Sequence, residues 1–229
     1  MFGQKYYKMK GNKPIINPMK QNFHAVEIQR RLLLADKADR LRIGLRDRDP
    51  KLVAERSGSF YLTVDPEHGE FRIPLWNVEH ILPFPELIAK SLSIFQQTLL
   101  FYYLLTADGT PPSEKWVSFA DLPDGRMYNA AFQGYTGNEA VKLFGNSLDV
   151  FRQACEKCGG IGEKIGDASY IFQALPRVPL MVTYWLGDDE FPSSCKILFD
   201  SSASHYLPID GCALLGSELT SRIMKASKI

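Results

Sequence analysis

The chain lacks a segment that could direct export or cross a membrane. Its first twenty residues are polar and are interrupted by Gly11, Pro14 and Pro18, so they do not supply the apolar core of a signal peptide. The most apolar stretch, residues 86–106, contains Lys90, two serines and two glutamines. It falls short of the roughly 18 uninterrupted apolar residues expected of a membrane span. We therefore expect a cytoplasmic protein without a membrane contact.

Cysteine is scarce, and the chain has only Cys155, Cys158, Cys195 and Cys212. Without an export signal, these residues are expected to be reduced thiols. Cys155 and Cys158 have the spacing of a redox or metal-binding pair, and the other two cysteines could complete a four-thiolate site. On a helix, however, positions i and i+3 share a face, so we favour small apolar side chains packed inward and predict no metal site.

The common signatures of nucleotide-binding and serine-hydrolase sites are also missing. The order Gly-x-x-x-x-Gly-Lys-Ser/Thr does not occur, and the glycine-rich residues 159–164 follow a predicted helix instead of opening one. No Gly-x-Ser-x-Gly sequence accompanies any histidine. The sequence therefore supports neither activity.

Charge is distributed unevenly along the chain. Residues 1–51 hold thirteen Lys/Arg and five Asp/Glu, a net charge of +8, whereas residues 52–229 hold fourteen and twenty-one, a net charge of −7. The basic segment could contact nucleic acid, but the acidic remainder and the lack of a recognised binding motif disfavour that function. We expect residues 1–22 to form a flexible basic arm.

Apolar and aromatic residues make up 45% and 12% of the chain, enough for one packed core over residues 23–229. Strands grouped around one long buried helix, without β-α-β alternation, predict an α+β fold with an antiparallel sheet. The expected helices are residues 23–42, 50–57, 86–106, 137–158 and 210–226. The expected strands are residues 60–64, 70–73, 75–78, 116–119, 169–173 and the two arms of a hairpin over 180–200.

Several short motifs together resemble a known family. They are residues 103–109, 115–125, 128–132, 158–160, 166–168, 175–180, 187–192, 198–200 and 206–208. Over roughly residues 50–225 the chain resembles the bacterial and archaeal domain-of-unknown-function family 3786. The resemblance implies an association with anaerobes, and some relatives carry the domain beside an iron–sulfur segment. Because the basic arm of this chain has no cysteine, the resemblance implies that any cluster belongs to a partner protein.

The acidic sequence 187–190 (GDDE) lies between two β-prone runs and is the most obvious candidate site. Strand alternation places Asp188 and Glu190 on one side and the middle carboxylate on the other. With Asp200 or His205 as a neighbour, this pair could bind a hard cation or act as acid and base. The favoured alternative is a solvated hairpin turn.

Aromatic residues offer a second candidate site, because several lie in polar, turn-rich segments. A pocket for a flat cofactor could be lined by Trp116, Phe119, Tyr128, Tyr135 and Trp185. Core packing accounts for most of these residues equally well. The sequence does not identify the cofactor.

We interpret the chain as a cytoplasmic binding or accessory protein that serves anaerobic cofactor or iron–sulfur metabolism through a partner protein. The interpretation depends on the family resemblance and on the missing catalytic constellation. The alternative is an enzyme, a hydrolase or transferase, that uses Asp188, Glu190, Asp200 and His205. A nucleic-acid contact through the basic N-terminal segment is the third hypothesis.

Overall fold

The computed structural model describes residues 18–228. It confirms an α+β fold, with two antiparallel sheets in the described part of the chain instead of one. One cluster of buried apolar residues extends through both halves of the molecule. None of the helices in residues 18–228 combines the length and the apolar character needed to cross a membrane.

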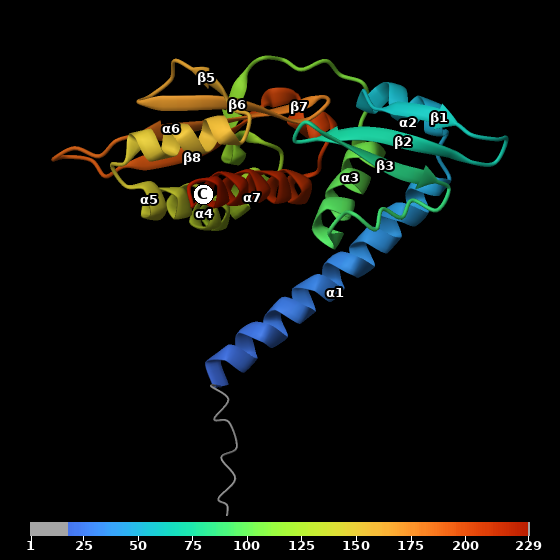
Figure 1. The fold of residues 1–229 in the computed structure, drawn as a ribbon, viewed down its shortest axis with the longest axis horizontal. Helices are drawn as coiled ribbons and strands as arrows, with labels where there is room; N and C mark the ends of the chain where they lie inside the picture. The colour runs from blue at the N-terminus through green and yellow to red at the C-terminus, as the bar shows by residue number, and fades with distance from the viewer. Residues whose placement is uncertain (1–17, 229) are drawn as a thin grey trace, which may run out of the picture.

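The N-terminal half is built on a three-stranded sheet (Figure 1). Its elements are α1 (Pro18–Arg46), α2 (Pro50–Ser57), β1 (Phe60–Thr63), β2 (Gly69–Leu75), β3 (Val78–Phe84) and α3 (Ile94–Thr106). The strands predicted over 60–64 and 70–73 are confirmed, and they pair antiparallel as a β1–β2 hairpin. The strand predicted over 75–78 is wrong, because Trp76 and Asn77 have φ values of 54° and 60° and form the two-residue turn between β2 and β3.

This turn joins the two halves of the molecule. The backbone N–H of Trp76 donates to the carbonyl of Ala174 in the second sheet at 2.9 Å, and the Trp76 side chain is buried. The guanidinium of Arg222 lies 5.3 Å from the centre of a Trp76 ring. An aromatic residue at a hairpin turn is therefore explained by its contacts with the other half.

The buried helix is shorter than the predicted 86–106. Leu87 has a φ of 55°, which interrupts a helical path, and the helix begins after Ser93. The Ser93 hydroxyl accepts from the backbone N–H of Gln96, whose side chain accepts in return from the Ser93 N–H, a capping box. Buried residues 98–104 confirm that α3 is a central core element.

The C-terminal half is built on a five-stranded sheet of order β4-β8-β7-β6-β5. Its strands are β4 (Trp116–Ser118), β5 (Ile161–Glu163), β6 (Ala168–Leu175), β7 (Val178–Trp185) and β8 (Ser194–Asp200). Its helices are α4 (Gly125–Tyr135), α5 (Gly137–Phe144), α6 (Leu148–Lys157) and α7 (Ile209–Ala226), with 3-10 turns η1 (Phe119–Asp121) and η2 (Ser201–His205). The helices α4, α5 and α7 lie beneath the sheet in Figure 1.

Two helix predictions in this half are corrected. The predicted helix 137–158 is divided into α5 and α6 at Gly145, whose φ of 50° ends the first helix. Helix α4 was not among the predicted helices. Among the long side chains of α4 only Phe132 is buried, so the helix has no apolar stripe to reveal it.

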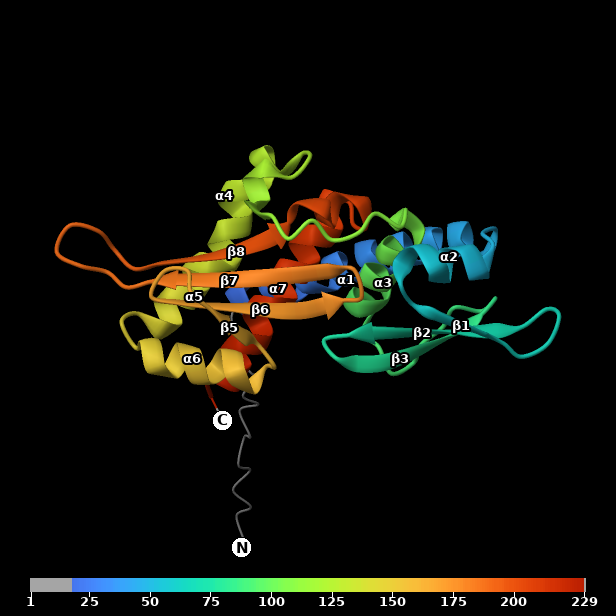
Figure 2. The ribbon, with the colours of Figure 1, turned by 90° about the horizontal axis from the view of Figure 1, so that it is seen from above.

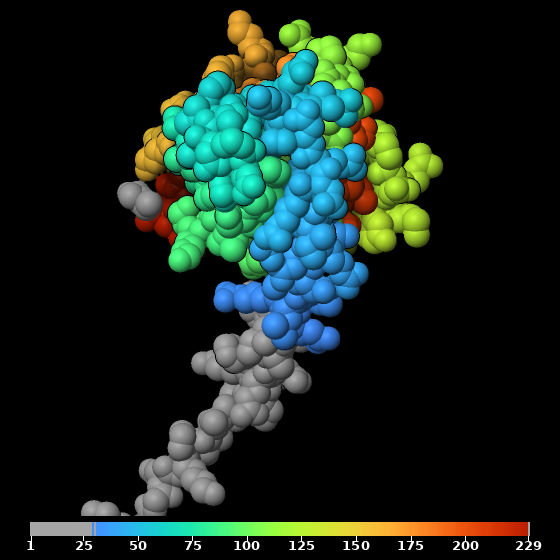
Figure 3. Space-filling model, turned by 90° about the vertical axis from the view of Figure 1, so that its right-hand side faces the viewer, coloured from blue at the N-terminus to red at the C-terminus, as the bar shows by residue number. Residues whose placement is uncertain are grey.

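The C-terminal half of helix α1 packs on the body. Ala38 and Leu45 are buried there, and the side chain of Arg46 donates to the carbonyl of Pro85 at 2.9 Å. Figure 3 shows this part of α1 alongside the first sheet, whereas Figure 1 shows the other half projecting away from the body. Of the flexible arm predicted over 1–22, residues 1–17 lie outside the described residues, and residues 18–22 belong to α1.

Candidate functional site

The acidic sequence 187–190 lies in the loop between β7 and β8, which extends beyond the end of the sheet (Figure 2). Asp188, Asp189 and Glu190 are all exposed. The Oδ1 atom of Asp188 accepts hydrogen bonds from the backbone N–H groups of Phe191 at 2.7 Å and Glu190 at 2.9 Å. These hydrogen bonds lower the pKa of Asp188. Asp188 therefore stabilises the turn in which it lies.

Asp200, at the other end of β8, is fully buried and anchors the strap, our name for the irregular residues 107–115 between α3 and β4. Its carboxylate accepts from the backbone N–H and the hydroxyl of Ser113 and from the N–H of Glu114. The N–H and hydroxyl of Ser202 donate to it as well. Burial alone would raise the pKa of Asp200, but the hydrogen bonds from Ser202 and Ser113 outweigh it and lower the pKa.

His205 binds a different part of the strap. Its Nδ1 lies 2.7 Å from a carboxylate oxygen of Asp108 and 3.2 Å from the hydroxyl of Thr110. The hydrogen bond with His205 lowers the pKa of Asp108 to about 2. Both members of the pair are about half exposed. A carboxylate that holds one imidazole nitrogen fixes the orientation of the ring, so His205 is the better placed of the predicted acid–base residues.

The four predicted catalytic residues do not form one site. Asp188 and Glu190 lie at one end of β8, whereas Asp200 and His205 lie at the other. A seven-residue strand separates the two pairs, which corresponds to roughly 20 Å. The sequence could not reveal this separation, because it depends on which end of the strand each loop occupies.

The predicted aromatic residues are also dispersed. They are Trp116, Phe119, Tyr128, Tyr135 and Trp185. Phe119 is a core residue whose ring stacks on Phe132 with centroids 4.1 Å apart, and the ammonium of Lys196 lies 5.6 Å from a ring centre of Trp185. The two tyrosines lie exposed on α4.

The four cysteines are free thiols, and only Cys158 is partly exposed. Burial raises the pKa of Cys195 and of Cys212 to about 12, and it also raises the pKa of Cys155. These three side chains are therefore uncharged thiols at neutral pH. Within residues 18–228 no group of three or more histidine, cysteine and acidic side chains is arranged to hold a metal ion.

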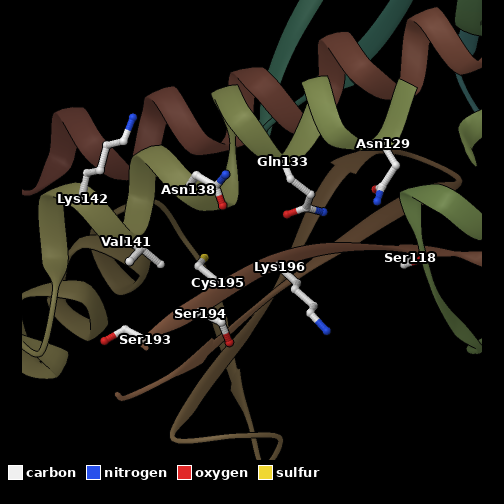
Figure 4. Close-up of a pocket in the computed structure, with 10 residues that line it drawn as sticks. All are labelled: Ser118, Asn129, Gln133, Asn138, Val141, Lys142, Ser193, Ser194, Cys195 and Lys196. Atoms are coloured by element: carbon white, nitrogen blue, oxygen red, sulfur yellow. The ribbon is translucent and has the colours of Figure 1, made fainter. Parts of the chain in front are cut away.

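A cavity of about 560 Å³ lies between α4, α5 and β8 (Figure 4). Its wall consists of three carboxamides, three serines, two lysines, one valine and one cysteine. Asn129 and Gln133 extend from α4, Asn138 comes from α5, and Ser194 and Lys196 come from β8. The volume lies in the range of ordinary small-molecule sites, and eight of the ten lining residues are polar.

Glycine at position 137 allows this wall to form. A Cβ atom placed there would lie 2.0 Å from the carbonyl oxygen of Cys195, closer than any real contact. The start of α5 can therefore approach the backbone of β8 only because position 137 has no side chain. This approach brings Asn138 within the same wall as Ser194 and Lys196.

Most polar side chains of the wall form no hydrogen bond with other residues in the range 18–228. Within residues 18–228, the side chains of Asn129, Gln133, Asn138 and Ser194 take part in no hydrogen bond. The Oδ1 of Asn129 is in addition buried from solvent. Buried polar groups in native proteins are nearly always paired, and an unpaired one costs about 1–3 kcal/mol.

Sequence reasoning missed this cavity. Its polar side chains come from four elements and the loop before β8, their spacing matches no motif, and one of the elements, α4, was not predicted. The only available signal was the concentration of asparagine and glutamine in residues 129–138, which reads equally well as an exposed surface.

Residues 49–222 match the family described as "Domain of unknown function (DUF3786)". The chain belongs to the DUF3786 family. The resemblance predicted over residues 50–225 is thereby confirmed. No curated protein and no solved structure matches the chain. The DUF3786 segment begins just before α2 and ends within α7, so it contains both sheets, the strap and the cavity, but not α1.

Several motifs by which the chain resembles the DUF3786 family have a structural role. Tyr103 donates to the carbonyl of Ser57 and accepts from the backbone N–H of Arg177 at 3.1 Å. Tyr206 donates to the carbonyl of Thr110, and the Tyr103 and Tyr206 rings are 5.8 Å apart. Motifs 103–109, 175–180 and 206–208 therefore meet where the strap joins the two halves.

Proposed function

We propose that this DUF3786 protein is a cytoplasmic, non-catalytic binding protein that takes up a small polar ligand in the cavity between α4, α5 and β8. One observation carries the proposal. Four polar side chains of the wall, Asn129, Gln133, Asn138 and Ser194, have no hydrogen-bond partner within the described residues. A bound polar molecule supplies those partners, and carboxamides both donate and accept.

The distribution of acid–base residues supports binding over catalysis. The cavity wall contains no carboxylate and no histidine. Asp200, the most buried carboxylate among the candidates, is occupied by the strap. The alternative, a hydrolase or transferase, would have to depend on the Asp108–His205 pair, which lies at the opposite end of β8 from Ser194.

The ligand site is tested by two-dimensional NMR of the isotopically labelled full-length protein. Mixtures of neutral sugars, sugar phosphates, organic acids, amino acids and nucleosides are added in turn. At least one mixture should shift backbone amide signals of α4, α5 and β8. The shifts should disappear in the double variant Asn129→Ala, Gln133→Ala and persist in the control Gln153→Ala, an exposed amide on α6. If no mixture of any charge shifts these signals, the proposal is wrong.

A second proposal concerns the partner protein. Helix α1 lies outside the DUF3786 segment and exposes Leu32 and Leu33 by 65% and 64%. We propose that this helix contacts a partner that carries an iron–sulfur or other cofactor. Iron that copurifies with the tagged protein from its native cells should be lost in Leu32→Gln, Leu33→Gln and retained in Leu52→Gln on α2. Equal iron in all three proteins would contradict the proposal.

A further inference from the structure

The cavity wall is positively charged. It contains Lys142 and Lys196 but no aspartate or glutamate. This contrasts with residues 52–229 as a whole, which carry twenty-one acidic side chains against fourteen basic ones. The charge of Lys196 would repel a cationic ligand and attract an anionic one.

The two lysines differ in how they are held. The ammonium of Lys142 forms an ion pair with Glu139 at 2.6 Å. The ammonium of Lys196 lies over the Trp185 ring, and within residues 18–228 it has no ion pair with a carboxylate. Trp185 therefore restrains the Lys196 side chain without neutralising its charge. Lys196 is the cation available to a ligand.

The other residues of the wall indicate which uncharged groups the ligand carries. Val141 and Cys195 are the only apolar residues among those that line the cavity. Asn129 and Gln133 can each donate and accept, which matches a hydroxyl group, itself both donor and acceptor. The Ser194 hydroxyl, beside Lys196 in Figure 4, can donate to an oxyanion.

We infer that the cavity binds a small hydroxylated molecule that carries one oxyanion, a phosphate or a carboxylate. Lys196 and Ser194 bind the oxyanion, and the carboxamides of Asn129 and Gln133 bind the hydroxyl groups. This inference rests on the proposed binding function and specifies its ligand.

Titration calorimetry with the full-length protein tests the ligand class. The probes are glucose 6-phosphate, gluconate, glucose and inorganic phosphate. The first or the second should bind, which also distinguishes phosphate from carboxylate. Glucose and inorganic phosphate should each bind at least about tenfold more weakly, because each lacks one half of the recognised groups. Binding of the anionic sugar should weaken as the salt concentration rises.

Variants assign the two contacts. Lys196→Gln should lower the affinity for the anionic sugar by about ten- to a hundredfold, because the variant loses a charge-assisted hydrogen bond. Lys157→Gln, an exposed lysine on α6, is the matched control and should bind like the wild type. Asn129→Ala should lower the affinities for the anionic sugar and for glucose by the same factor. Lys196 and Lys157 are both exposed, so both variants are expected to fold.

Three results would overturn the ligand class. They are glucose binding as tightly as both anionic sugars, an affinity unchanged in Lys196→Gln, and no binding of either anionic sugar. If the NMR mixtures still identify another ligand of the cavity, only the ligand class is wrong. If they identify none, the proposed binding function is wrong as well.

Discussion

Replacing Asp200 by asparagine should destabilise the protein by releasing the strap. Oδ1 of Asp200 accepts four hydrogen bonds, from the N–H and hydroxyl of Ser113 and of Ser202, and Oδ2 accepts from the N–H of Glu114 at 2.6 Å. An asparagine oxygen in the Oδ1 position keeps four of these bonds, but its amide faces the Glu114 donor. A hydrogen bond to a charged group contributes about 1.5–3 kcal/mol, so we expect a loss of about 2–3 kcal/mol.

Alanine at the same position should be more damaging. It removes all five acceptor interactions and leaves several donors unpaired in a buried site. Breaking a buried charged network in this way typically costs about 3–5 kcal/mol. Urea unfolding at neutral pH, followed by circular dichroism, measures both variants. Asp149→Asn, whose side chain is 88% exposed, is the matched control and should change stability little.

The pH dependence gives an independent check. The pKa of Asp200 is lowered in the folded protein, so its contribution is present above its unfolded pKa of about 4 and is lost as the pH falls through the folded value. The stability difference between wild type and Asp200→Asn should therefore shrink in acid. A loss below about 0.5 kcal/mol for Asp200→Asn at neutral pH would refute the anchoring role of the carboxylate.

Three further predictions follow from burial. Leu99→Ala should cost about 2–5 kcal/mol in urea unfolding, because Leu99 is fully buried in α3, and a loss below about 0.5 kcal/mol would make α3 peripheral. Burial raises the pKa of Glu218 in the folded protein. Ionisation of this side chain therefore increasingly destabilises the fold as the pH rises above the unfolded pKa of about 4.3. Glu218→Gln should therefore have a higher melting temperature than the wild type at neutral pH and the same melting temperature in acid. Equal melting temperatures at both pH values would contradict this. In the native protein a disulfide reagent should modify partly exposed Cys158 first, and early reaction of Cys195 would contradict its burial.

The sequence alone predicted the features that depend on neighbouring residues. The α+β class, the β1–β2 hairpin, the central burial of α3 and the final helix follow from local periodicity and turn residues. The family resemblance was confirmed because its motifs lie along the chain in order. The early start of the predicted core helix was wrong, because composition does not show that Leu87 adopts a positive φ.

The tertiary structure decided the features that depend on residues distant in sequence. Trp76 lies in a hairpin turn because its backbone N–H donates to Ala174 and its ring contacts Arg222, both in the other half of the molecule. No local propensity predicts such a turn. The predicted catalytic residues were separated by the length of β8, and the cavity arose where Gly137 lets α5 approach that strand. A polar residue can be paired, solvated or available to a ligand. Which of these three states a polar residue adopts depends on the packing of segments that are distant in sequence, because those segments supply its hydrogen-bond partners.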